Sequence, residues 1–304
     1  MPTPPAPILV AVAQPAATLP AEDHAYEPKL DGWRTVVHAP AGVLHTRHAA
    51  DITWRFPEIL DAAHSLGASL VLDGELVAYR GERLDFPALM WGARRRAVEG
   101  VAVVFVAFDL LAYRGRDLRH LPYTERRQRL ADVVAGSAHV QLMDATTDPG
   151  KGAGWISADC AAVGIEGTVA KPLASRYPLR GGPCGWVKVR YRTVVDAVVL
   201  GVTGTIEAPT ALVLGRLGDD RRVHMIGLSS TLPRRVRSAL AGRLRPEGLR
   251  RRAAGLVAGL PGSEDFDYQP VAPGIVVEVE ADSAQEWGRF RHRLALLRIR
   301  PPRG

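Results

Sequence analysis

The sequence predicts an α+β protein of two domains, in which a small β-barrel follows a larger domain of strands and helices. The chain has 304 residues, which is long enough for two domains. Strand-like and helix-like segments are mixed up to Arg192, whereas short strands separated by Gly and Pro dominate after Val194. We therefore expect one domain over residues 1–193 and a second over residues 194–304.

The first part of the larger domain shows strands and one helix. Residues up to about 25 are rich in Pro and Ala, which predicts an irregular arm with a short strand near Ile8–Val12. A strand is expected over Lys29–Ala39. Thr53, followed by Pro57-Glu58, suits the start of a helix that runs to about residue 65.

Two strands dominate the middle of this domain. Ser69–Tyr79 is expected to be a strand with Asp73 and Glu75 on one face, because these acids are two residues apart. Val101–Ala112 is almost continuously apolar and β-branched, as expected of a strand buried on both faces. Between them, Arg94–Arg96 is expected to form a solvated loop, with DNA contact as the alternative.

The remaining elements follow from periodicity and turn residues. A helix over Thr124–Val134 would turn an arginine-rich face outward and three apolar residues toward the core, namely Leu121, Leu130 and Val133. A helix near Trp155–Val163 should precede two strands, Gly167–Lys171 and Gly185–Tyr191.

The second domain is expected to be a barrel of short strands around one helical stretch, Pro233–Leu244. An oligonucleotide-binding (OB) barrel is the natural candidate for short strands separated by Gly and Pro residues. The strands are expected at Val194–Gly201, Ala211–Leu217, Val223–Ile226 and Ile275–Val279.

The composition is that of a globular protein with a basic surface. Hydrophobic residues make up 47% of the chain and charged residues 23%, and no apolar run approaches the length of a membrane span. Cys160 and Cys184 are too few and too far apart for a zinc site or a disulfide framework, so a cytoplasmic protein with reduced thiols is expected. A net charge of +7 and a pI of about 9.8 predict a polyanionic partner.

Lysine is rare in this basic chain. Of 39 lysines and arginines only four are lysines, so 35 are arginines. A guanidinium is always protonated, whereas an amine can lose its proton and attack an electrophile. Lys151 is expected in a loop, but the other three lysines lie in patterned segments and are candidates for positions that arginine cannot fill: Lys29, Lys171 and Lys188.

Lys29 begins the motif Lys-Leu-Asp-Gly, which on its own is a weak signal because Asp-Gly is first of all a turn. Residues later in the chain also have simple structural explanations when taken singly: Glu75 suits an exposed strand face, Phe108 a core, and Lys188 an outward strand position. Together, four later segments supply what nucleotidyl transfer to a lysine needs: Val71–Leu76, Phe105–Leu111, Glu166–Lys171 and Trp186–Arg190.

The chemistry of that transfer explains the residue types. An attacking amine must be partly deprotonated, and charge on the α-phosphate must be stabilised, so cations or a metal are needed nearby. Arg34, Lys171 and Lys188 can supply the cations. Phe108 can offer a flat apolar surface to a base. Carboxylates for a divalent metal are available from Asp31, Glu75 and Glu166.

In this order, the segments resemble the nucleotidyltransferase motifs of ATP-dependent DNA ligases, of the compact bacterial kind related to stand-alone and end-joining repair ligases. Further similar segments extend the resemblance over nearly all of the chain: Thr46–Glu58, Leu121–Arg127, Ser175–Tyr177 and Asp196–Gly204. The resemblance implies a nucleotidyltransferase (adenylation) domain of antiparallel sheets with flanking helices over residues 1–193, and an OB-fold over residues 194–304.

The resemblance also implies the reaction. Lys29 would attack the α-phosphate of ATP, release pyrophosphate and form lysyl-AMP. AMP would pass to the 5′-phosphate of nicked double-stranded DNA, and the 3′-hydroxyl would displace it and seal the strand. The implied cofactors are ATP and Mg²⁺ or Mn²⁺. A bacterial monomer acting in DNA repair at the nucleoid is expected, with end-joining or other repair proteins as partners and no membrane.

Residue roles at the nucleoside are implied in the same way. Glu27 would lie at the adenine edge, Phe108 would stack on one face of the base, and Val169 would close the other face. Arg34 and Arg47 would contact the ribose and the phosphate at the nick.

At the phosphates, Lys188 would grip the α-phosphate with Arg190 and Lys171. Glu166 would be a metal-side carboxylate, and Glu75 would bind the ribose hydroxyl or help to hold the metal.

The sequence departs from the ligase pattern at two places. Arg190 stands where a second lysine is usual, which keeps the charge but changes its geometry. In the tail, Arg298 and Arg300 fit basic positions expected to close over pyrophosphate, but Pro302 replaces an expected aspartate. This departure predicts a weakened first step, or a weakened coupling of that step to movement of the barrel. The simpler alternative for these arginines is a plain basic tail.

Three other functions compete with this interpretation. An RNA ligase or an mRNA-capping guanylyltransferase that uses GTP would share the chemistry, but Arg55–Glu58 and Phe108–Leu111 favour the DNA ligase. A non-catalytic DNA-end-binding module would share the fold. The presence of Lys29 in a chain that otherwise avoids lysine argues against that module.

Overall fold

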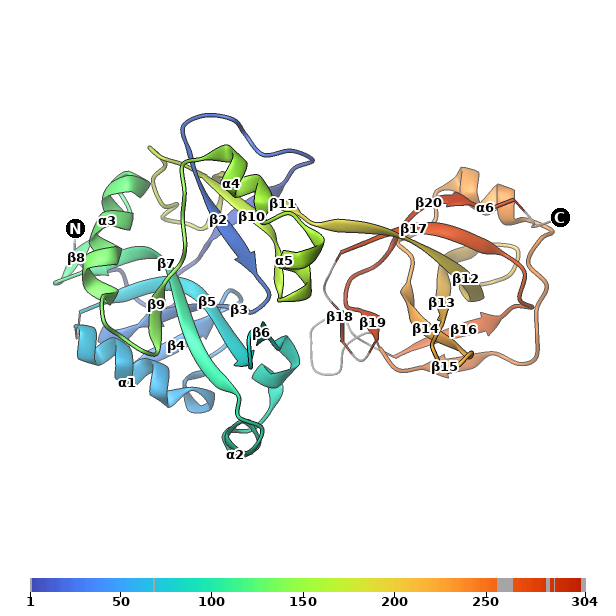
Figure 1. Cartoon of the computed structure of the whole chain (residues 1–304), viewed down its shortest axis with the longest axis horizontal. Helices are drawn as coiled ribbons and strands as arrows, with labels where there is room; N and C mark the ends of the chain where they lie inside the picture. The colour runs from blue at the N-terminus through green and yellow to red at the C-terminus, as the bar shows by residue number, and fades with distance from the viewer. Residues whose placement is uncertain (1, 68, 256–264, 283–284, 287, 302–304) are drawn as a thin grey trace. The chain divides into compact units, whose positions relative to one another are not determined.

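The computed structural model divides into two compact units, Met1–Tyr191 and Arg192–Gly304 (Figure 1). It describes residues 2–67, 69–255, 265–282, 285–286 and 288–301. Pro302, where the sequence departs from the ligase pattern, lies outside the described residues. No helix in the described parts of the chain is long and apolar enough to cross a membrane.

The larger sheet of the first unit has the strand order β4-β3-β5-β7-β8, with β6 added to β5 and β9 to β7. The strand β7 is buried along almost its whole length, which confirms the prediction from its apolar, β-branched sequence. The bounds are β3 (Trp33–His38), β4 (Val43–Thr46), β5 (Val71–Arg80), β6 (Arg83–Leu84), β7 (Ala102–Tyr113), β8 (Arg116–Asp117) and β9 (Val140–Leu142).

The smaller sheet of this unit has the order β1-β11-β10-β2. Its strands are β1 (Ala11–Pro15), β2 (His24–Leu30), β10 (Ile165–Pro172) and β11 (Gly182–Arg190). Apolar residues from both sheets form one core, including Val36, Val106, Phe108, Tyr177 and Trp186. The two sheets therefore pack together, and side chains at their junction can meet across it.

The strand predicted over Lys29–Ala39 is in fact two strands in different sheets. β2 ends at Leu30 and belongs to the smaller sheet, whereas β3 begins at Trp33 and belongs to the larger one. The chain crosses between the sheets at Asp31-Gly32. A Cβ on Gly32 would lie 2.4 Å from the carbonyl oxygen of Leu76, so only glycine fits this close crossing.

Short helices flank the sheets. α3 packs against β7 and β9, α4 against β2, and α5 against β10. The helices are α1 (Pro57–Leu66), α2 (Ala93–Val98), α3 (Tyr123–Val134), α4 (Pro149–Gly154) and α5 (Ala158–Ala162), with 3-10 turns η1 (Ala39–Ala41), η2 (Thr53–Arg55) and η3 (Phe86–Met90).

Three local predictions were wrong. The N-terminal strand is Ala11–Pro15 instead of Ile8–Val12, because pairing with β11 begins at Ala11. The helix expected over Trp155–Val163 is interrupted, since Ser157 is extended and caps α5 with its hydroxyl.

The third error concerns Arg94–Arg96, which lies in α2 and not in a solvated loop. The Arg96 guanidinium is buried because it donates to the backbone carbonyl oxygens of Trp91, at 2.5 Å, and of Arg55, at 3.0 Å. Those acceptors come from residues that precede the helix, which a local sequence pattern does not reveal.

The second unit is an antiparallel β-structure around its own core, which includes Val199, Leu212, Leu240 and Val277. The long strand β12 pairs with β13, β16 and β17. The elements are β12 (Arg192–Gly204), β13 (Pro209–Leu217), β14 (Val223–Leu228), α6 (Arg234–Leu240), β15 (Arg251–Ala253), β16 (Phe266–Pro270), β17 (Val276–Asp282), β18 (Gln285–Glu286), β19 (Arg289–Phe290) and β20 (Ala295–Ile299).

Hydrogen bonds of the second unit form a closed circuit. β12 pairs with β13, β13 with β14, β20 with β17, and β17 with β12. The gap between β14 and β20 is bridged by Leu294, whose N–H donates to Leu228 at 2.9 Å and whose carbonyl accepts from Ser230 at 2.7 Å. A circuit of this kind leaves few open strand edges.

Candidate active site

The smaller sheet presents a row of polar side chains toward the sheet junction. Glu27 on β2 lies opposite Val169 on β10, and Val169 lies opposite Lys188 on β11. Residues directly opposite each other project from the same face, as do residues two apart on one strand. Lys29 and Arg190 therefore extend this face by one further row.

Lys29 contacts Glu166, and Arg190 lies 3.8 Å from the same carboxylate. Glu166 lies where the register between β10 and β2 shifts, and its side chain is only 4% exposed. The next residue, Gly167, has φ +144°, and a Cβ there would lie 2.1 Å from the carbonyl oxygen of Val189. Glycine at position 167 thus permits the register shift between β10 and β2 that brings Glu166 to Lys29.

Lys188 lies in a cationic environment. Burial lowers the pKa of Lys188, and the charges of Arg190, Lys29, Arg47 and Arg34 lower it further. Among the residues that the structure describes, Lys188 forms no ion pair with a carboxylate. An amine that has cationic neighbours and no carboxylate partner of its own is suited to an anion such as a phosphate.

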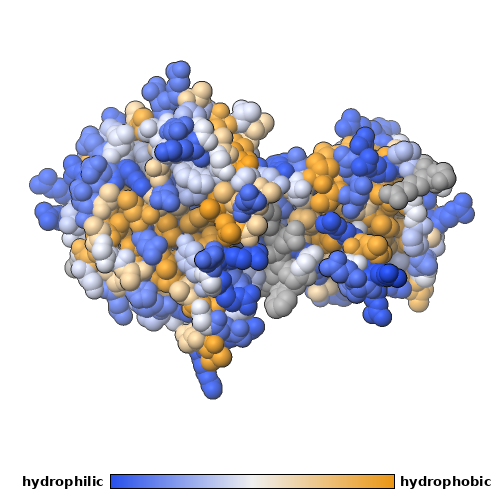
Figure 2. Space-filling view, viewed as in Figure 1, coloured by the Kyte–Doolittle hydropathy of each residue, from blue (hydrophilic) through white to orange (hydrophobic). Residues whose placement is uncertain are grey.

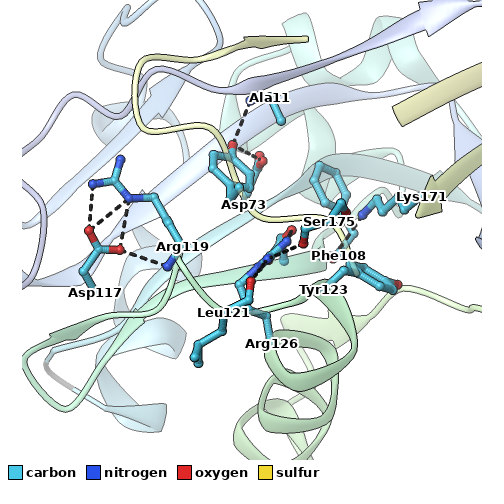
Figure 3. A network of polar contacts seen from close by, with 12 residues as sticks. Ala11, Asp73, Phe108, Asp117, Arg119, Leu121, Tyr123, Arg126, Lys171 and Ser175 are labelled. Carbon is cyan, nitrogen blue, oxygen red and sulfur yellow. Dashed lines mark hydrogen bonds and ion pairs between the residues drawn. The ribbon is translucent and has the colours of Figure 1, made fainter. Parts of the chain in front are cut away.

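A buried network holds Glu27. Lys171 Nζ lies 2.7 Å from Glu27 Oε2, and the Tyr123 hydroxyl donates to Glu27 Oε1 at 2.7 Å. Lys171 also donates to the carbonyl oxygen of Phe108 at 3.1 Å, as Figure 3 shows. Burial raises the pKa of Tyr123, and the charge of Glu27 raises it further, which keeps this hydroxyl a donor.

Aromatic rings surround the Lys171 ammonium, which lies 4.2 Å from the ring centroids of both Phe108 and Trp186. Phe108 is the extra residue of a bulge, because Asp73 pairs with Asp109 and the adjacent Gly74 pairs with Ala107. The bulge turns Phe108 toward the smaller sheet. Burial lowers the pKa of Lys171 despite the opposing charge of Glu27.

Lys171 thus lies elsewhere than the sequence predicted. The expectation was a grip on the α-phosphate beside Lys188, but its ammonium contacts Glu27 and Phe108, the two residues expected around the adenine.

Arg34 is engaged by Asp73. Its Nε and Nη2 donate to the two carboxylate oxygens at 3.0 and 2.6 Å, and its Nη1 donates to the carbonyl of Ala11 at 2.6 Å. Tyr177 donates to the same carboxylate at 2.6 Å. Arg34 therefore ties β1, β3 and β5 together, and its predicted contact with the ribose or nick phosphate stays a prediction.

Arg126 forms a second buried, bidentate ion pair, which holds β7 beside Phe108. Its Nε and Nη2 donate to Asp109, the neighbour of Phe108, at 2.7 and 2.8 Å, and both side chains are fully buried. Its Nη1 donates to the carbonyls of Leu121 and Ser175 (Figure 3). The prediction that α3 has an arginine-rich outer face was therefore wrong at Arg126.

The inward face of α3 was also misplaced by the sequence pattern. Tyr123, Leu130 and Val134 are buried, whereas Val133, predicted to face the core, is partly exposed.

Two carboxylates near Lys29 suit a divalent metal. Among the described residues no three Asp, Glu, His or Cys side chains form a metal site by themselves. Burial raises the pKa of Glu75 to about 8; Lys29 and Arg34 oppose this effect, while Asp31 and Glu166 add to it. Mg²⁺ usually binds one or two carboxylates together with substrate phosphates and water, so Glu75 and Glu166 fit an ion that arrives with the nucleotide.

Three predicted residues remain: Arg47 in the first unit, and Arg298 and Arg300 in the second. Arg47 is exposed on the turn after β4. In the second unit, Arg298 pairs with Glu278 at 2.7 Å, and Arg300 pairs with Asp196 at 3.0 Å. Their roles as nucleotide contacts stay predictions.

A lysine just before the crossing between two packed sheets, close to the cations Lys188 and Arg190, suits nucleophilic attack on a phosphate that forms a lysyl adduct. The family description "ATP dependent DNA ligase domain" matches residues 7–190. The chain belongs to the family of ATP-dependent DNA ligases.

Individual relatives agree with this assignment. DNA ligase C1 of Mycolicibacterium smegmatis is 31% identical over 299 residues, covering 91% of this chain and 85% of the relative. DNA ligase C of Mycobacterium tuberculosis is 28% identical over 331 residues, covering 98% and 91%. Among solved structures, a mycobacterial DNA ligase D complexed with ATP and MES has a TM-score of 0.53 at 25% identity and covers 97% of this chain and 94% of that chain.

Proposed function

We propose that this ligase seals nicks or breaks in duplex DNA through a lysyl-AMP intermediate on Lys29. The observation that carries the proposal is the contact of Lys29 with Glu166 on a sheet face that also holds Lys188 and Arg190. Once its ammonium has lost a proton to solvent, Lys29 Nζ attacks the α-phosphorus of ATP, the N–P bond forms as the P–O bond to pyrophosphate breaks, and pyrophosphate leaves. A DNA 5′-phosphate then takes the AMP from Lys29, and a 3′-hydroxyl displaces AMP to form the phosphodiester.

At the base, Glu27 accepts a hydrogen bond from the adenine amino group. Tyr123 and Lys171 support this role, because each occupies one of the carboxylate oxygens and fixes its orientation. Phe108 stacks on one face of the base and Val169 closes the other. Guanine carries an acceptor in place of the amino group, so the same arrangement disfavours GTP.

At the phosphates, Lys188 and Arg190 neutralise the charge that develops on the α-phosphate. Their cationic surroundings and the position of Lys188 in the same row as Glu27 support this assignment. Glu166 holds the Lys29 ammonium before reaction. A divalent cation held by Glu75 and Glu166 would supply further positive charge at the phosphates when bound.

The two parts of the chain have separate roles in this proposal. Residues 1–193 form the adenylation domain and residues 194–304 an OB-fold domain, which the closed strand circuit of the second unit supports. In this role Arg298 and Arg300 of the second domain contact pyrophosphate, Arg34 supports the ribose side of the site, and Arg47 contacts the nick phosphate. The setting is DNA repair, with nicked double-stranded DNA as substrate.

A label-transfer assay tests the proposal. The protein is incubated with Mg²⁺ and either ATP or GTP labelled at the α-phosphate, and a nicked duplex is added afterwards. Label should appear on the protein with ATP alone and then move to the DNA 5′-phosphate. Equal labelling from GTP would favour a capping-type enzyme, sealing confined to RNA strands would favour an RNA ligase, and no labelling with either nucleotide would favour a non-catalytic module.

A further inference from the structure

We infer that a surface beside the Lys29 turn, formed by Trp54, Arg55, Trp91 and Arg95 and called here the Trp54–Trp91 surface, binds unpaired bases of a DNA strand. Trp54 is 75% exposed, although it is among the largest apolar side chains of the chain. Because most of its side chain stays in water, Trp54 contributes little hydrophobic free energy to folding. Its ring face is available to a partner that offers flat rings of its own.

Rigid contacts hold Trp54 in place. It lies on η2, next to Arg55, whose guanidinium lies 5.1 Å from the Trp54 ring and 5.6 Å from the Trp33 ring. Arg55 Nη2 also donates to the carbonyls of Leu89 and Met90, at 3.1 and 2.8 Å. The exposed Trp54 ring therefore lies on a 3-10 turn, η2, that the hydrogen bonds of Arg55 hold in place.

A second aromatic–arginine pair shares the same anchor. The Arg95 guanidinium stacks 3.9 Å from the ring centroid of Trp91. Buried Arg96 donates to the carbonyl oxygens of both Trp91 and Arg55, which ties the two pairs together. Two rings flanked by guanidinium groups on one fixed platform match the way that proteins bind single strands, by stacking bases and by attracting the backbone.

The charge of this surface favours a polyanion over an apolar protein partner. Arg94 and Arg95 are exposed, and neither pairs with a carboxylate in the described parts of the chain. In Figure 2, hydrophobic and strongly hydrophilic surface lie side by side around α2 at the lower edge of the view. Fully paired DNA hides its base faces, so the occupant that uses both rings and cations is an unpaired strand.

The position of this surface connects it to the proposed chemistry. Trp33 directly follows Gly32 at the sheet crossing after Lys29, and it packs edge-on against Phe56, with ring centroids 6.2 Å apart. The Arg55 guanidinium lies 5.6 Å from the Trp33 ring. Trp33 thus links the turn after Lys29 to the Trp54–Trp91 surface, which an overhang or displaced strand from the joining site would meet.

Binding of a fluorescein-labelled single strand of thymidylates to the full chain tests this inference. Trp54→Ala should weaken binding by about 5- to 100-fold, the loss expected for one stacked base, whereas Trp54→Phe should stay within about threefold of the wild type. Val98→Ala removes another exposed apolar side chain, 79% exposed on α2, and should leave the affinity unchanged. Affinity for a fully paired, unnicked duplex should change little in all three variants.

Equal single-strand affinity of Trp54→Ala and wild type would overturn the inference, as would an equal loss in Val98→Ala. A concentration-dependent dimer in sedimentation that Trp54→Ala abolishes would assign the surface to a second copy of the chain instead. Self-adenylylation with ATP is measured in parallel and should be the same in all variants. Its failure in the wild type would count against the proposed function and not against the single-strand site.

Discussion

The ammonium of Lys171 and the carboxylate of Glu27 form a buried ion pair, with 2.7 Å between Nζ and Oε2. Both side chains are almost fully buried, at 1% and 2% exposure. Lys171 also donates to the carbonyl oxygen of Phe108, so its charge is held by Glu27 and Phe108 and is not free for a phosphate. If Glu27 recognises the base as proposed, its orientation depends on Lys171 and Tyr123, which are buried beside it.

Tyr123→Phe tests the support of Glu27. The change removes the hydroxyl that donates to Glu27 Oε1 and leaves that buried oxygen without this partner. We expect the KM for ATP to rise several-fold and the free energy of unfolding to fall by about 1 kcal/mol, the usual size for one buried hydrogen bond.

The matched control is Tyr113→Phe. The Tyr113 hydroxyl makes no hydrogen bond in the part of the chain that the structure covers, so its removal should cost little. An unchanged KM for ATP in Tyr123→Phe, with GTP still rejected, would show that Glu27 keeps its orientation without Tyr123.

Arg126→Met should strongly destabilise the first unit. The substitution leaves the fully buried Asp109 carboxylate without its fork of hydrogen bonds. Removing one partner of a buried ion pair costs about 3–5 kcal/mol of unfolding free energy. Chemical denaturation measures the loss.

Arg129→Met is the control on the same helix. Arg129 pairs with Glu125 at 3.8 Å, but both side chains are half exposed, so its loss should cost no more than about 0.5 kcal/mol. Similar losses for the two variants would contradict the structural role given to Arg126.

Glu75 should make the nucleotide-free protein less stable as the pH rises. Its pKa is raised from 4.5 to about 8 in the folded state, mainly by burial. A raised folded-state pKa means that the folded protein retains the proton, so this contribution is full below the unfolded pKa and is lost as the pH approaches 8. In metal-free buffer, the wild type should lose more unfolding free energy than Glu75→Gln between pH 5 and 9.

Urea unfolding in the presence of a chelator gives this comparison directly. Parallel stability curves for the two proteins over the same pH range would mean that Glu75 is ionised in the folded state.

The sequence reveals the groups that act on the substrate better than the residues that position them. Lys29 stands out as the candidate nucleophile because arginine replaces lysine almost everywhere else, and the proposed chemistry requires an amine. The strand β7 can be identified because its apolar run is long and β-branched. Both signals are local in the chain.

The supporting contacts are not local, and they escape prediction for that reason. Tyr123 and Glu27 are 96 residues apart, and a tyrosine at the start of a helix looks like an ordinary core residue. Arg126 looks like a solvated helix residue until Asp109, 17 residues away, is known to be buried beside it. Lys171 was expected at the α-phosphate, but its amine contacts Glu27 and Phe108, which the motif order does not reveal.

The central claim is that Lys29 carries AMP covalently, and Lys29→Arg tests it most directly. Arginine keeps the positive charge beside Glu166 but has no amine to attack phosphorus. Lys151 was expected in a loop but lies in the short helix α4, which the Asp148 side chain caps. Lys151→Arg is the matched control, and thermal melting checks that each variant is folded. With α-labelled ATP and Mg²⁺, we predict wild-type labelling of Lys151→Arg and no covalent label on a folded Lys29→Arg, whereas wild-type labelling of Lys29→Arg would contradict the account.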